Sequence, residues 1–166
     1  MAIDYLSQNP FAVLSIVAAP AILTNASSVL ALSTSNRFLR AGERMRALAA
    51  QLHTTPSGAE KDMLIVQVSR VERQALLLLT ALRGAYVALG AFAAASLISI
   101  VGAGLSSTQF LAASYITVVL GLVVGFVGAG GLIVACLNLF RATRLSLLNI
   151  SEEAALIRQR ESPRAT

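Results

Sequence analysis

The sequence predicts an all-α integral membrane protein with three transmembrane helices, a cytoplasmic antiparallel helical hairpin between spans 1 and 2, and a C-terminal cytoplasmic helix. Of its 166 residues, 56% are hydrophobic and only 13% are charged, against about 45–50% and about 25% in soluble domains. The segments Tyr5–Asn36 and Gly84–Phe140 contain no Asp, Glu, Lys or Arg. All thirteen basic residues lie in two segments, eight in Arg37–Arg83 and five in Arg141–Arg164.

The two uncharged segments supply the three spans. One crossing of a hydrocarbon core about 30 Å thick needs about 20 apolar residues. The first segment therefore gives one span, at about 11–36, and the second is long enough for two. Its short polar turn "SSTQ" separates spans at about 84–105 and 110–140. We expect residues 1–166 to form a single membrane domain, and no basic residue precedes the first apolar run, so we expect that run to be retained rather than cleaved.

The distribution of basic residues predicts the orientation. Basic loops stay in the cytoplasm, so both basic segments are expected inside, with the N-terminus outside and the C-terminus cytoplasmic. This topology and the attraction to anionic lipid headgroups account for the net charge of +5 without nucleic acid as a partner.

The segment 37–83 has the pattern of two amphipathic helices. Apolar residues recur at spacings of three and four in each half, at Phe38, Ala41, Met45, Leu48 and Leu52, and then at Leu64, Val68, Val71, Ala75, Leu78 and Leu82. The sequence "TTPSG" between them predicts a turn. The matching stripes favour a hairpin over helices lying flat on the headgroups, which is the alternative. No breaker separates these helices from the adjoining spans, so each is expected to continue into its span. A further helix at 141–160 is expected to pack on the hairpin.

Small residues mark candidate helix contacts inside the membrane, where close backbone approach favours association. They are Gly121, Gly125 and Gly128 in the third span and Gly84, Ala88, Ala91 and Ala95 in the second. Such faces serve contacts within one chain or between chains. Because three helices form a small bundle, we expect part of this surface to bind a second subunit, giving a homo-oligomer.

The first span carries a polar face. On an ideal helix a sector of about 120° contains Thr24, Asn25, Ser28, Ser35 and Asn36, with Ser27 and Thr34 at its border. One interpretation is a pore lined by copies of this helix. The alternative is that the hydroxyl groups bond to their own helix while Asn25 bonds to a neighbouring one. A stripe of Arg37, Arg40 and Arg44 follows, as a basic vestibule or a contact to lipid headgroups, but it is offset around the helix from the polar face.

Residues for catalysis are missing from the predicted spans, which contain no acid, base or histidine. The single histidine, His53, has no Cys or His near it in sequence to complete a zinc site. We therefore expect no enzyme activity, no metal and no cofactor. The leading hypothesis is a homo-oligomeric ion channel, and the alternative is a structural or accessory subunit docked on a larger membrane complex.

The chain resembles a bacterial family of small membrane proteins, domain of unknown function 2721. The resemblance is carried by "PAILTNASSVLALSTSNRFLRAGERMRAL" at Pro20–Leu48 and by the "RLSL…EE" region at Arg144–Glu153. In that family a span ending in Asn-Arg leads into an Arg-rich helix, matched here by Asn36, Arg37, Arg44 and Arg46. The resemblance implies a bacterial inner-membrane protein and brings no known activity.

Overall fold

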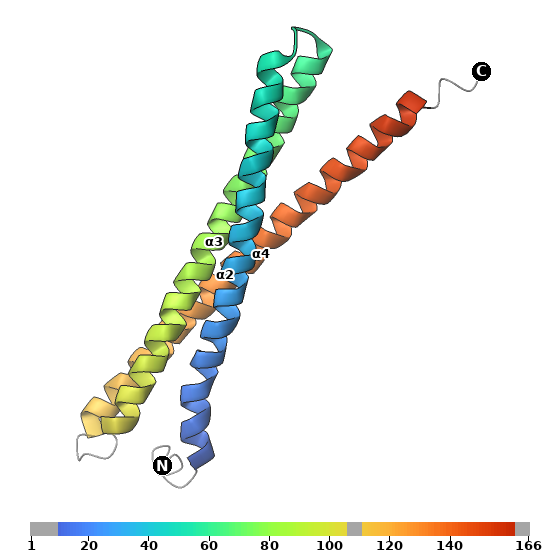
Figure 1. Ribbon diagram of the computed structural model, residues 1–166. Helices are drawn as coiled ribbons and strands as arrows, with labels where there is room; N and C mark the ends of the chain where they lie inside the picture. The colour runs from blue at the N-terminus through green and yellow to red at the C-terminus, as the bar shows by residue number, and fades with distance from the viewer. Residues whose placement is uncertain (1–9, 106–110, 162–166) are drawn as a thin grey trace. The chain divides into compact units, whose positions relative to one another are not determined.

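The computed structural model describes residues 10–105 and 111–161, which form three helices: α2 (Pro10–Thr54), α3 (Ala59–Leu105) and α4 (Leu111–Glu161) (Figure 1). Side chains are described over 18–102, at 104 and over 115–147. The all-α prediction is confirmed. Each helix continues without a break through the predicted membrane boundaries, as expected for α2 and α3. The predicted turn at 106–109 lies outside the described residues.

The predicted turn between α2 and α3 is confirmed. At the end of α2, the hydroxyl groups of Thr54 and Thr55 each donate a hydrogen bond to the Gln51 carbonyl oxygen, at 3.0 and 2.8 Å. Gly58 has a φ of 152°, which glycine adopts readily because it has no Cβ. Its carbonyl oxygen accepts the first bond of α3, from the Lys61 N–H at 3.0 Å. Glu60 begins an acidic first turn, which the helix dipole stabilises.

The chain divides into two compact units, each described by itself. The first unit combines α2 as far as Ser33 with Leu82–Ala135, and the second combines Thr34–Ala81 with α4 from Cys136 onward. Each unit therefore contains a segment of all three helices.

Most of the buried side chains in the first unit are small, and Phe92 is the large exception among the described residues. Ala31, Ala85 and Ala135 form one buried cluster, with one residue from each helix. Around them α3 and α4 approach at glycines: a Cβ added to Gly84 would lie 2.8 Å from the carbonyl oxygen of Gly131. Backbone thus meets backbone, a contact that a larger side chain at either position would prevent.

The second unit has larger apolar side chains in its core. Leu78 is buried with Ala41 and Ala142, and the half-buried side chains packed against this cluster are Phe38, Ala75, Leu77 and Leu139. Phe38, Ala41, Ala75 and Leu78 belong to the stripes predicted for the hairpin. The hairpin of α2 and α3 around the turn at 55–58 can be followed in Figure 1.

Two of the helices are long and apolar enough to cross a membrane: Ala59–Gly102 in α3 and Tyr115–Leu147 in α4, judged by length and composition. No such stretch lies in the part of α2 whose side chains are described, which begins at residue 18 and so leaves out the apolar residues before it. The three-span arrangement therefore stays a prediction.

Candidate functional site

The inward face of α2 is a continuous stripe of buried residues, which are small and partly polar in the first half of the helix and apolar in the second half. Ser27, Ala31 and Thr34 are buried in that order, and Ala41 and Leu48 continue the stripe. Their spacings of four, three, seven and seven are those of a helix packed along one seam. Extending the hairpin stripe backwards from Phe38 would have identified Ser27 and Thr34, which sequence reasoning placed only at the border of the polar face. The Ser27 hydroxyl group is fully buried and has no hydrogen-bond partner among the described residues.

The predicted polar face lies beside this stripe. Asn25, Ser28 and Asn36 are exposed, while Thr24 and Ser35 are half-buried. The Thr24 hydroxyl group donates a hydrogen bond to the Pro20 carbonyl oxygen at 2.8 Å, as the alternative interpretation expects for hydroxyl groups. The amide of Asn25 and the hydroxyl group of Ser28 face away from the core of the first unit. The other helices therefore leave most of this face uncovered.

The basic stripe lies on the opposite flank of α2. On an ideal helix Ser35 follows Thr34 by about 100°, whereas Arg37, three residues after Thr34, lies about 60° the other way. The Arg37 guanidinium Nη1 donates a hydrogen bond to Thr143 Oγ1 of α4 at 3.3 Å. Arg40 and Arg44 are exposed. A basic vestibule that shares one axis with the polar face is therefore disfavoured, because Arg37 is directed towards α4.

Most of the predicted small-residue contacts lie between helices of this chain. Gly84, Ala88 and Ala95 are buried and Ala91 is half-buried. A Cβ added to Gly128 would lie 2.8 Å from Phe92 Cε1, and one added to Gly121 would lie 3.5 Å from Ile98 Cγ2. Of the four predicted glycines, only Gly125 has no described atom within 4 Å of an added Cβ. The sequence did not reveal Ala31 and Ala135 as partners of these residues, because neither stands in a glycine motif.

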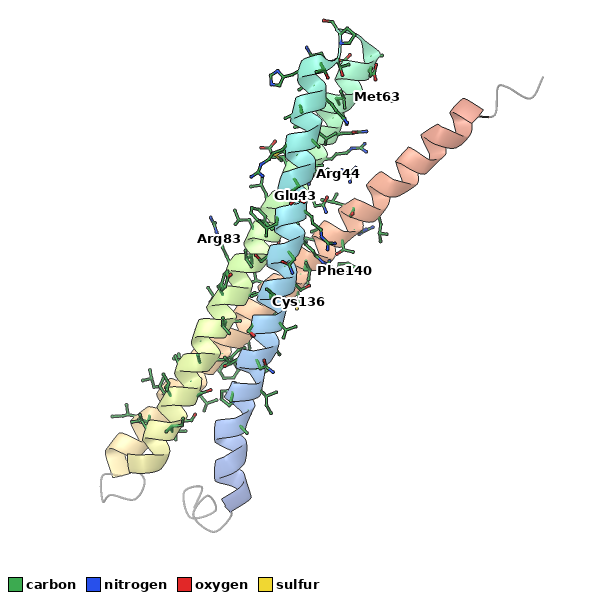
Figure 2. All side chains as sticks on the ribbon, in the orientation of Figure 1. Glu43, Arg44, Met63, Arg83, Cys136 and Phe140 are labelled. Atoms are coloured by element: carbon green, nitrogen blue, oxygen red, sulfur yellow. The ribbon has the colours of Figure 1, made fainter. Side chains whose placement is uncertain are left out.

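Groups for metal chemistry are absent from the described residues, which contain no cluster of three or more His, Cys, Asp or Glu side chains able to hold an ion. Cys136 is a free, exposed thiol on α4 (Figure 2). The expectations of no cofactor and no enzyme activity stay predictions.

Comparison with known proteins gives one match. No curated protein and no solved structure matches the chain. The model of the family described as "Protein of unknown function (DUF2721)" matches residues 17–151, a range that includes the polar face, the basic stripe and the α3–α4 contact. Because the match extends over most of the sequence and confirms the resemblance seen in its motifs, the chain belongs to the DUF2721 family.

Proposed function

We propose that this protein is a three-span bacterial inner-membrane protein that forms a homo-oligomeric, ion-conducting pore lined by the polar face of α2. The observation that supports the proposal most strongly is the exposure of Asn25, Ser28 and Asn36 beside the stripe that packs on α3 and α4. Uncovered by the chain's own helices, these polar groups need water or another protein if α2 lies in a membrane.

Residence in a membrane is supported by the exposed apolar surface of the first unit. Of the most apolar 18-residue stretch of α4, within Tyr115–Leu147, only 11% is buried. Its large exposed side chains include Ile116, Val119, Leu122, Val123, Phe126 and Val127. Soluble monomers rarely expose a continuous apolar surface of this kind, whereas lipid would cover it at no cost.

The proposed membrane boundaries agree with the division into units. The units divide at Ser33/Thr34, Ala81/Leu82 and Ala135/Cys136. A basic residue lies near each division: Arg37 and Arg141 in the second unit, and Arg83 as the second residue of the first unit's segment of α3. Arg83 projects outward from α3 (Figure 2). In this proposal most of the first unit lies in lipid, the parts of both units near Arg37, Arg83 and Arg141 lie at the cytoplasmic headgroups, and the rest of the second unit lies in the cytoplasm, with the N-terminus outside.

The pore is favoured over an accessory role by the use of the small-residue faces. Docking on a larger complex was expected to occur through those faces, but Gly84, Gly128 and Gly131 already contact residues of the same chain. The uncovered polar face of α2 therefore becomes the leading surface for self-association. Gly125, with open space around it, is the feature that favours the accessory alternative.

Ion flux from liposomes containing the purified protein tests the pore. We expect flux from the native protein and a large loss with Asn25→Leu and with Ser28→Leu, since both changes place apolar groups on the proposed lining. Ser69→Leu is the matched control, because Ser69 is exposed in the second unit and its hydroxyl group bonds only to its own helix, at Val66 O. A defined oligomer without flux would reject the pore, and co-purification with a larger complex would then support the accessory role.

Labelling with a membrane-impermeant maleimide tests the proposed orientation in a Cys136→Ser background. A cysteine at His53, which is exposed at the end of α2, should react only from the cytoplasmic side. A cysteine at Val123, exposed on α4, should react only after the membrane is dissolved, because lipid covers it. Reaction of the His53→Cys protein from outside would show that the orientation is reversed.

A further inference from the structure

The contact between Arg37 and Thr143 fixes a guanidinium group at the surface of the second unit. Thr143 Oγ1 donates its proton to the Leu139 carbonyl oxygen at 2.9 Å, so its lone pairs remain to accept the bond from Arg37 Nη1 at 3.3 Å. The hydroxyl group thus links Arg37 to the backbone of α4. Arg37 is exposed, and a guanidinium group has five N–H donors, so this single bond leaves donors available to a ligand.

The surroundings of Arg37 favour an anion. Glu43 is the only acidic residue in α2, and six residues along an ideal helix place it about 120° around from Arg37. Residues 111–147 of α4 contain no acidic residue. Arg40, one turn after Arg37 on the same stripe, is also exposed. Glu43 lies three residues after Arg40, at a neighbouring position on the helix, so Arg37 is the guanidinium group of the pair without an acidic neighbour on α2. It matches the planar, multidentate recognition of phosphate, and Arg40 adds positive charge beside it.

An exposed apolar surface adjoins the same site. Phe140 lies one turn before Thr143 on α4 and is 69% exposed, and Leu147 lies one turn after it and is 63% exposed. Phe140 projects outward from α4 (Figure 2). Arg37 is also the first charged residue after the uncharged segment Tyr5–Asn36. These N–H donors are suited to bind phosphate, and they lie beside an apolar surface at the end of an uncharged helix segment. This combination matches the chemistry of a phospholipid better than that of a soluble anion.

We propose that Arg37, positioned by Thr143 and assisted by Arg40, binds the phosphate of an anionic phospholipid, with an acyl chain against Phe140. This inference rests on the membrane insertion proposed above, but it does not depend on a pore. It also gives the basic stripe a role that agrees with its position on the flank of α2 opposite the polar face.

Retention of phosphatidylglycerol, measured by native mass spectrometry of the full chain in mild detergent doped with phosphatidylglycerol or phosphatidylcholine, tests the site. We expect a preference for phosphatidylglycerol, weakened about fivefold by Arg37→Gln, which corresponds to about 1 kcal/mol per basic residue at a membrane surface. Thr143→Val should weaken retention less, without any change of charge. Arg46→Gln is the matched control, because Arg46 is exposed on the same helix, about 180° around from Arg37.

Equal losses in the Arg37→Gln and Arg46→Gln proteins would show that only diffuse positive charge attracts the lipid, and would overturn the site. Displacement of phosphatidylglycerol by an equal concentration of inorganic phosphate would assign the site to a free anion and reject the lipid. Helical circular dichroism verifies that each variant is folded. Protein removed from membranes by carbonate would contradict both proposals, whereas inserted protein that conducts ions without lipid preference would contradict this one alone.

Discussion

The two units of this protein bring the same three helices together with different side chains. In the first unit Ala31, Ala85 and Ala135 form the buried cluster and Gly84 and Gly131 are in backbone contact, while Phe92 is the one large buried apolar side chain among the described residues. In the second unit Leu78 is the central buried side chain, with larger apolar residues packed around it. The same three helices are therefore held together mainly by small residues in the first unit and by larger apolar side chains in the second.

This difference has a physical reason if the first unit lies in lipid and most of the second unit lies in water. Lipid tails are as apolar as leucine, so burying a large side chain between helices gains little there, and close approach through small residues supplies the attraction. In water, removal of apolar surface drives association and favours large side chains. The smaller size of most buried side chains in the first unit thus agrees with the proposed membrane boundary near the division between the units.

The largest effect is expected in the second unit, from Leu78→Ala. Leu78 is 2% exposed, so its truncation leaves a cavity and should lower the free energy of unfolding by about 3 kcal/mol. Unfolding followed by circular dichroism in mixed mild detergent and sodium dodecyl sulfate measures the change. Leu76→Ala is the matched control on the same helix, because Leu76 is 58% exposed. Equal effects of the two substitutions would show that Leu78 is not a core residue in solution.

A smaller loss of stability is expected in the first unit from Gly84→Ala, which adds a methyl group instead of removing side-chain atoms. The added methyl group would lie 2.8 Å from the Gly131 carbonyl oxygen and 3.0 Å from the Ala135 nitrogen. Since neither backbone atom can move away freely, we expect a loss of about 2 kcal/mol in the free energy of unfolding.

Gly90→Ala on the same helix is the control for Gly84→Ala, because no atom lies within 4 Å of its added Cβ. There the better helix propensity of alanine should raise the free energy of unfolding by about 0.5–1 kcal/mol. The same substitution is therefore expected to change sign between the two positions. A stabilising Gly84→Ala would contradict the backbone contact between α3 and α4.

The smallest effect concerns the unpaired hydroxyl group of Ser27, and Ser27→Ala should stabilise the first unit. Ser27 is fully buried without a hydrogen-bond partner among the described residues, and such a group costs free energy. The control Ser96→Ala removes a half-buried hydroxyl group that donates to the Phe92 carbonyl oxygen at 2.9 Å. We expect the gain in unfolding free energy from Ser27→Ala to exceed that from Ser96→Ala by about 1 kcal/mol. A loss instead would indicate that Ser27 has a partner in the assembled protein.

The two halves of the buried stripe of α2 were not equally predictable from the sequence. The stripe through Phe38, Ala41 and Leu48 was predicted correctly, because large apolar residues at helical spacing are distinguishable from their polar neighbours. Its continuation through Ser27 and Thr34 was missed, because small polar residues occur on buried and exposed faces alike inside a membrane helix. Whether the exposed Asn25 and Ser28 meet water stays a prediction, as does the role of the basic stripe.

The sequence by itself determined that this chain is helical, where its hairpin turns and to which family it belongs, since helix periodicity, turn residues and family motifs are local properties of the chain. Only the tertiary structure decided which neighbours each face meets: Gly84 and Gly131 with each other, Arg37 with Thr143, and Ser27 with the interior. These contacts involve residues far apart in sequence. They depend on the rotational orientation of each of the three helices about its own axis, which decides which faces meet. Periodicity gives the faces of each helix, but it does not give that rotation.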